Sequence, residues 1–97
     1  MKTITKDQWI ELVQQTDDAI ILDVRTPQEC VEGMLDNAQQ LNVLNGHLFM
    51  NEIETFDTEK SYFIYCKSGG RSAQACRLME MKGFTKLYNL QGGYSKW

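Results

Sequence analysis

The stretch of sequence that decides the fold is YFIYCKSGGRSAQACRLMEMKG, residues 62–83. It opens with an apolar run of strand length that ends at Cys66. A short loop with two adjacent glycines follows, and then a helical pattern begins whose apolar face is Ala75, Leu78 and Met79 and which stops at Gly83. The stretch therefore predicts a strand, a tight loop and a helix, with a thiol at the end of the strand.

The same alternation of short apolar runs and helical patterns extends over the whole chain. We expect strands at 19–24, 38–43, 61–66 and 86–91, helices at 6–15, between Thr26 and Gly33, at 47–56 and at 70–82, and a final turn at 92–97. This alternation is typical of βαβ units, which form a mostly parallel sheet with right-handed crossovers and helices on both faces. In such sheets ligands bind beyond the carboxyl ends of the strands, where Cys66 lies.

Two capping boxes mark the starts of the first two helices. Thr5 is followed three residues later by Gln8, and Thr26 by Glu29, with Pro27 at the favoured first helical position. For the first helix we expect an inward face made of Trp9, Ile10, Leu12 and Val13, and for the third an inward face made of Leu48, Ile53 and Phe56.

Length and charge narrow the class of protein. A chain of 97 residues has room for one domain, and we treat residues 1–97 as a single domain. The net charge of −3 and the absence of a basic run argue against nucleic acid as a partner. No apolar stretch is long enough to cross a membrane, and the first residues are too polar for a signal peptide. We therefore expect a cytoplasmic protein, although removal of an export signal would leave the same sequence.

The loop between Cys66 and Arg71, CKSGGR, combines four features that favour an anion beside a reactive sulfur. Gly69 and Gly70 allow positive φ, so that successive N–H groups can turn inward as an anion-binding nest. The start of the next helix adds free donors and partial positive charge. Arg71 offers a planar set of donors, Lys67 adds a nearby cation, and all four features stabilise the thiolate.

The remaining thiols and the single histidine fit structural roles better. Three cysteines cannot all pair, and their spacing matches no zinc site, so we expect free thiols and no metal. Cys76, on the helix after the loop, could resolve a disulfide, but its helical neighbours indicate core packing. His47 lies at a predicted helix start and is interpreted as a surface residue. The alternative interpretation of Cys66 itself is a buried cysteine beside an ordinary turn.

Three blocks of the sequence resemble the rhodanese family in its short, single-domain form. They are LDVRTPQECVEG (22–33), CKSGGRS (66–72) and LQGGYSKW (90–97), which occur in the family's order. The resemblance covers about residues 20–97. It implies an α/β, three-layer fold with a central, mostly parallel five-stranded sheet and helices on both faces, and it implies sulfurtransferase chemistry.

The resemblance also implies which residues do this chemistry. Cys66 would attack the outer sulfur of thiosulfate or a persulfide donor, become a persulfide, and pass the sulfur to cyanide, to a thiol or to a thiol-bearing protein partner. No cofactor is needed. The residues expected to bind the anionic donor are Lys67, Ser68, Gly69, Gly70, Arg71 and Ser72.

Two other functions use similar parts. Cysteine phosphatases and arsenate reductases also set a cysteine and an arginine around a helix start, but their loops are one residue longer, and a tighter ring suits a single sulfur atom better than a phosphate tetrahedron. A non-catalytic docking or sulfur-carrier module would keep the fold, but a docking module without chemistry would be expected to lack the cysteine.

Residues outside the loop are given supporting roles. We interpret Asp23 and Arg25 as a polar pair that holds loops together, with substrate contact as the alternative. Cys30 stands where the family often has an aromatic residue and is interpreted as a small core residue. The tripeptide GML (33–35) replaces a common Gly-His-Ile, and the family pattern continues after Trp97 into a last helix.

Overall fold

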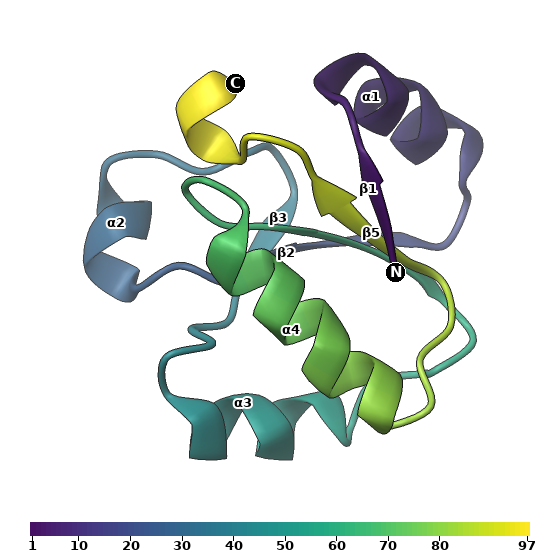
Figure 1. The fold of residues 1–97 in the computed structure, drawn as a ribbon, viewed down its shortest axis with the longest axis vertical. Helices are drawn as coiled ribbons and strands as arrows, with labels where there is room; N and C mark the ends of the chain where they lie inside the picture. The colour runs from purple at the N-terminus through teal and green to yellow at the C-terminus, as the bar shows by residue number, and fades with distance from the viewer.

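The computed structural model describes residues 1–97 and alternates strands with helices (Figure 1). The elements in chain order are β1 (Lys2–Ile4), α1 (Lys6–Gln15), β2 (Ala19–Asp23), α2 (Pro27–Val31), β3 (Ala38–Gln40), α3 (Gly46–Ile53), β4 (Ser61–Tyr65), α4 (Gly70–Met81), β5 (Leu87–Leu90) and a 3₁₀ turn, η1 (Tyr94–Lys96). The predicted helix at 6–15 has the observed bounds, and the other predicted elements are present with ends shifted by a few residues.

The five strands form one parallel sheet in the order β1-β5-β4-β2-β3. The predicted α/β fold with a parallel five-stranded sheet is therefore confirmed. β4 lies at its centre, and all five of its residues are buried, as its continuous apolar sequence requires. The edge strand β1 was not predicted from the residues, because three residues carry no periodic signal of their own. It joins the sheet by pairing with β5.

Helices cover both faces of the sheet, which makes three layers (Figure 1). On one face α3 and α4 bury a core of Phe49, Ile53, Ala75, Cys76 and Met79 against alternate residues of β2 and β4. On the other face α1 buries Trp9, whose ring meets Phe63 edge-on with centroids 5.4 Å apart. Alternation along β4 thus sends Cys66, one residue past the strand, toward α4.

Both predicted capping boxes form, and they fix where α1 and α2 begin. The Thr5 side chain accepts from the Gln8 N–H while the Gln8 side chain accepts from the Thr5 N–H, and Thr26 and Glu29 repeat the arrangement. Even the longest helix, α4 with 12 residues, is too short to cross a membrane.

Two inward residues were assigned to the wrong side of their helices. Ile10 is 37% exposed and Leu48 is 44% exposed, whereas Trp9 and Phe49 are buried. In α3 the side chains that face the sheet are Phe49 and Ile53, four residues apart, so Leu48 points outward. In α1 the same one-residue offset from the buried Trp9 leaves Ile10 partly exposed to solvent.

Candidate active site

Cys66 lies directly after β4, where the chain leaves the sheet toward the first turn of α4. The residue is 1% exposed. Its Sγ accepts a hydrogen bond from the Gly69 N–H at 3.0 Å, and the Ser72 Oγ lies 3.3 Å away. The loop therefore curls over the sulfur and presents donors to it.

The curl depends on Gly69, which has a φ of 111° and stands at the N-cap of α4. A residue with a side chain would be strained in this conformation. The prediction that Gly70 shares the role is wrong, because Gly70 is already the first helical residue and has no positive φ. The free N–H groups of the first turn of α4 thus open toward Cys66.

These contacts stabilise the thiolate form of Cys66. Burial by itself raises the pKa of the thiol, because it removes the charged form from water. The Ser72 side chain and the backbone N–H groups of Ser72, Gly69 and Ser68 act in the opposite direction and prevail, so the pKa of Cys66 is lowered. A lowered pKa is the property that a nucleophilic cysteine needs at neutral pH.

Arg71 is already paired, which was not predicted. Its Nη1 donates to Glu29 Oε1 at 2.7 Å and its Nη2 donates to Glu29 Oε2 at 2.9 Å. Glu29 lies on α2, so this helix holds the Arg71 side chain, which comes from the first turn of α4. The two terminal nitrogens of the planar donor set expected to serve an oxyanion are thus engaged by Glu29 in the structure. The exposed Lys67 makes no ion pair and remains available to an incoming anion.

The C-terminal turn supports the loop from behind. The Tyr94 N–H donates to the Cys66 carbonyl at 2.8 Å, and the Ser95 N–H donates to the Lys67 carbonyl at 2.9 Å. These bonds require the two backbones to approach closely at Gly93, which has a φ of 60° and a ψ of −160°. The sequence hint for this contact was the pair of glycines in LQGGYSKW, whose partner could not be read from the sequence.

Asp23 and Arg25 form a buried pair at the end of β2. Arg25 Nη2 lies 2.7 Å from Asp23 Oδ2 and also donates to the Gly33 carbonyl at 2.7 Å, and its guanidinium lies over the Tyr94 ring. Burial raises the pKa of Asp23, but the hydrogen bonds from Arg25 and Tyr65 and the Arg25 charge together outweigh it, and the pKa is lowered. The pair thus ties β2, the end of α2 and the C-terminal turn together.

The other thiols are not activated. Cys76 is fully buried, and burial raises its pKa to about 12. Cys30 is only half-buried, which corrects its assignment to the core, and burial together with the nearby Asp23 charge raises its pKa to about 11. His47 is exposed, and no group of three or more His, Cys, Asp or Glu side chains is placed to hold a metal ion.

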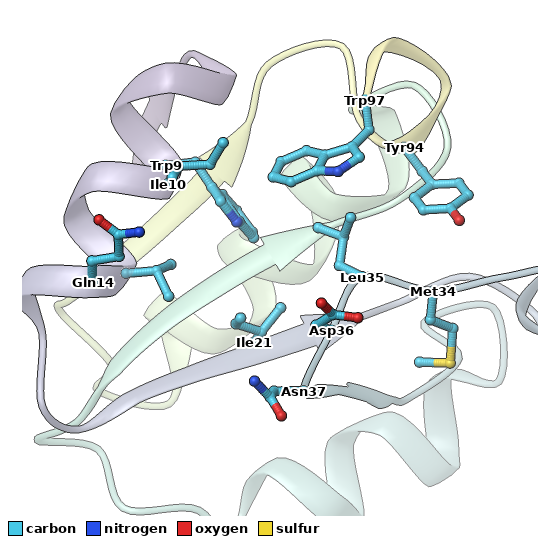
Figure 2. A pocket seen from close by; sticks show the side chains of 11 residues that line it. Trp9, Ile10, Gln14, Ile21, Met34, Leu35, Asp36, Asn37, Tyr94 and Trp97 are labelled. Carbon is cyan, nitrogen blue, oxygen red and sulfur yellow. The ribbon is translucent and has the colours of Figure 1, made fainter.

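The largest hollow of the molecule is separate from Cys66. It has a volume of about 450 Å³ and lies on the α1 face, with Trp9 of α1 and Trp97 of the chain end around it and Ile21 of β2 in its floor (Figure 2). Its lining is mostly apolar and contains no cysteine or histidine. A smaller polar hollow of about 160 Å³ adjoins the Cys66 loop and is lined by Arg25, Glu29, Glu32, Lys67, Tyr94 and Ser95.

A parallel α/β sheet with a hydrogen-bonded cysteine at the carboxyl end of its central strand defines a class of proteins that use a loop-activated thiolate. Comparison with known proteins narrows the class. The model of the family described as "Rhodanese-like domain" matches residues 5–97. The chain belongs to the rhodanese-like domain family, and the resemblance of the three sequence blocks is confirmed.

Individual relatives agree with this assignment. A sulfurtransferase of Allochromatium vinosum is 33% identical over 94 residues, covering 97% of this chain and 85% of the relative. The thiosulfate sulfurtransferase GlpE of Pseudomonas putida is 27% identical over 96 residues, covering 99% of this chain and 84% of the relative. The crystal structure of a rhodanese-like domain protein from Staphylococcus aureus superposes with a TM-score of 0.85 at 29% identity, covering 100% of this chain and 91% of the other. The family is thus one of sulfurtransferases.

Proposed function

We propose that the chain is a sulfurtransferase that carries a sulfane sulfur on Cys66, from thiosulfate or a small persulfide donor to a thiol or cyanide acceptor. The observation that carries the proposal is the convergence of the Gly69 N–H and the Ser72 Oγ on the Cys66 Sγ, which stabilises a nucleophilic thiolate. The printed names of the A. vinosum and P. putida relatives support the same reaction class.

The reaction needs two displacements and no external oxidant. The Cys66 thiolate attacks the outer sulfur of thiosulfate, an S–S bond forms to Sγ, and the S–S bond of thiosulfate breaks so that sulfite leaves with the electron pair. The acceptor then attacks the terminal sulfur of the persulfide. Cyanide takes it as thiocyanate, or a thiolate takes it as a new persulfide, and the Cys66 thiolate returns. The two half-reactions predict ping-pong kinetics.

The surroundings of Cys66 support a small anionic donor. The residue is 1% exposed, so a slender donor reaches the sulfur more easily than a bulky one. We assign donor binding to Lys67, the backbone N–H groups from Ser68 to Ser72 and the part of Arg71 that Glu29 leaves free. The polar hollow beside Lys67 offers the acceptor a path of approach.

Intact mass under non-reducing conditions tests the proposal. After incubation with thiosulfate, and separately with glutathione persulfide, the wild type and Cys30→Ser should gain one sulfur atom, and Cys66→Ser should gain none. Cyanide should remove the gain and release thiocyanate. A gain in Cys66→Ser, or no gain in the wild type with either donor, would overturn the proposal.

Further assays separate the alternatives. Turnover of phosphate esters or arsenate without sulfur uptake would identify a cysteine phosphatase or arsenate reductase instead. Uptake of sulfur without release to cyanide or any thiol would identify a sulfur carrier.

A further inference from the structure

Asn89 is a buried polar residue that the proposed sulfur chemistry leaves without a role. It lies on β5 between Thr3 of β1 and Ile64 of β4 in the sheet register, and it is 4% exposed. Burial of an amide is costly unless it is hydrogen-bonded. Its Oδ1 lies 2.5 Å from the Ser72 Oγ, which is itself 3.3 Å from the Cys66 Sγ. Asn89, on the strand β5 that pairs with β4, is thus connected to the Cys66 sulfur through the Ser72 hydroxyl group.

Ser72 has more acceptors around it than it has hydrogens. Its Oγ lies 3.1 Å from the Gly69 carbonyl, 2.5 Å from the Asn89 Oδ1 and 3.3 Å from the Cys66 Sγ, but a hydroxyl group carries a single hydrogen. While Cys66 is a thiol, its S–H can donate to the Ser72 Oγ and the Ser72 hydrogen can point to Asn89. The network is then satisfied.

Loss of the Cys66 proton breaks this arrangement. A thiolate only accepts hydrogen bonds, so the Ser72 hydroxyl adds to the stabilisation by the backbone N–H groups only when its hydrogen turns toward the sulfur. Two oxygens, Ser72 Oγ and Asn89 Oδ1, would then face each other at 2.5 Å with no hydrogen between them. Rotation of the Asn89 side-chain amide by half a turn removes the conflict, because it replaces the Oδ1 acceptor with the Nδ2–H donor.

We propose that Asn89 is a positioning residue whose amide turns over when the Cys66 proton leaves, so that Asn89 Nδ2–H donates to Ser72 Oγ and Ser72 O–H donates to Cys66 Sγ. The proposal deepens the proposed function, because it assigns control of the same nucleophile to a residue outside the loop. Asn89 acts through Ser72 and touches neither donor nor acceptor.

Other titratable groups near the sulfur do not replace this chain of hydrogen bonds. Arg71 is paired with Glu29 of α2, and Lys67 is exposed to solvent. Cys76, the one thiol on α4, stays protonated at neutral pH because burial raises its pKa. None of them contacts Ser72 or Asn89 through a hydrogen bond.

A double-mutant cycle on the alkylation of Cys66 tests the coupling. The rate with iodoacetamide is measured from pH 5 to 10 for Asn89→Asp and Asn89→Leu, each made in the wild type and in a Ser72→Ala background. The Asp variant keeps an acceptor that holds the Ser72 hydrogen, and it should slow alkylation at pH 7 by about tenfold. The negative charge of the introduced aspartate acts on the thiolate whether or not the Ser72 hydroxyl is present. In the Ser72→Ala background, Asn89→Asp should therefore slow alkylation by only about twofold or less.

The Leu variant keeps the test valid if the Asp variant fails to fold. It should slow alkylation about two- to threefold where Ser72 is present and leave the rate unchanged in the Ser72→Ala background. Equal effects in the two backgrounds, from either substitution, would overturn the proposal.

A direct measurement follows the amide itself. In a ¹⁵N NMR titration, the side-chain NH₂ resonances of Asn89 should shift with the same midpoint as the thiolate absorbance of Cys66, and this shift should be absent in Cys66→Ser. Resonances that stay fixed through the Cys66 titration would overturn the proposal. Neither measurement needs a sulfur donor, so a failure of sulfur transfer and a failure of the Asn89 proposal are distinguishable.

Discussion

Replacement of Gly93 with alanine would test whether the C-terminal turn holds the Cys66 loop in its reactive shape. A Cβ at this position would lie 2.5 Å from the carbonyl oxygen of Cys66 and 2.6 Å from the carbonyl carbon and oxygen of Lys67. These are backbone atoms, and they cannot swing aside as the end of a side chain would. Either the turn or the loop must move.

Two costs add at Gly93. The backbone there, with φ 60° and ψ −160°, lies in a region that only glycine adopts without strain, and forcing another residue into it costs about 1–3 kcal/mol. Overpacking against fixed neighbours adds about 1–3 kcal/mol. We expect the free energy of unfolding to fall by about 4 kcal/mol, which corresponds to a drop in Tm on the order of 20 °C. A shift of the loop by about 1 Å should slow sulfur uptake roughly 100-fold.

Gly83→Ala provides the matched control. Gly83 also has a positive φ, of 94°, but a Cβ added there would have no neighbouring atom within 4 Å, so only the backbone strain of about 1–2 kcal/mol applies. Urea unfolding gives the stability of each variant, and single-turnover sulfur uptake from thiosulfate, followed by intact mass, gives the reactivity of Cys66. Equal destabilisation by the two substitutions, or an unchanged rate of sulfur uptake in Gly93→Ala, would refute the reasoning.

Three further predictions concern the Arg71–Glu29 ion pair, the Arg25–Asp23 ion pair and the thiol of Cys30. Glu29→Gln keeps the capping box but removes the negative charge that pairs with Arg71, whose hydrogen bonds lower the pKa of Glu29 to about 2. A carboxylate with a lowered pKa stabilises the fold above its unfolded pKa of 4.5, and this stabilisation is lost as the pH falls toward 2. In urea unfolding, the free energy of unfolding of the wild type should therefore fall by about 1 kcal/mol more than that of the variant between pH 4.5 and 2. Parallel pH profiles of the two proteins would contradict this. Asp23→Asn leaves Arg25 buried without a counter-charge and should lower the free energy of unfolding by about 3 kcal/mol, and a loss under about 1 kcal/mol would contradict the structural assignment. Cys30, with a pKa raised to about 11, should be alkylated slowly at neutral pH and much faster near pH 11, as followed by peptide mass spectrometry; rapid labelling at pH 7 would show that the assignment is wrong.

Features with a strong local signal were predicted well from the sequence. The capping residues Thr5 and Thr26 fixed the starts of two helices, because a cap is a contact between residues three apart. The apolar run before Cys66 marked the buried central strand. Ile10 and Leu48 were misplaced because a neighbouring apolar residue one position away competes for the same inward face, and only packing against the sheet decides between them.

Contacts between distant parts of the chain could not be predicted. The sequence indicated Cys66 and its loop, since the glycines, the arginine and the helix start are adjacent in it. The partner of Arg71 is contributed by α2, and the partner of Ser72 by β5. Strand β1 exists only because β5, from the other end of the chain, pairs with it. Each of these contacts joins residues that are far apart in the chain, so neither partner's local sequence indicates the other.

The hydrogen bonds from the C-terminal turn to the Cys66 loop also have a consequence for the life of the chain before it is folded. A polypeptide that is still being synthesised lacks the Tyr94 and Ser95 amides until residues 1–93 have been made, and a partly unfolded chain has them out of place. In both, the Cys66 loop lacks the two hydrogen bonds that hold its backbone in the shape that aims the Gly69 and Ser72 donors at the sulfur. The enhanced reactivity of Cys66 is therefore expected to arise together with the completed fold, late in synthesis, and to be lost when the C-terminal turn unfolds.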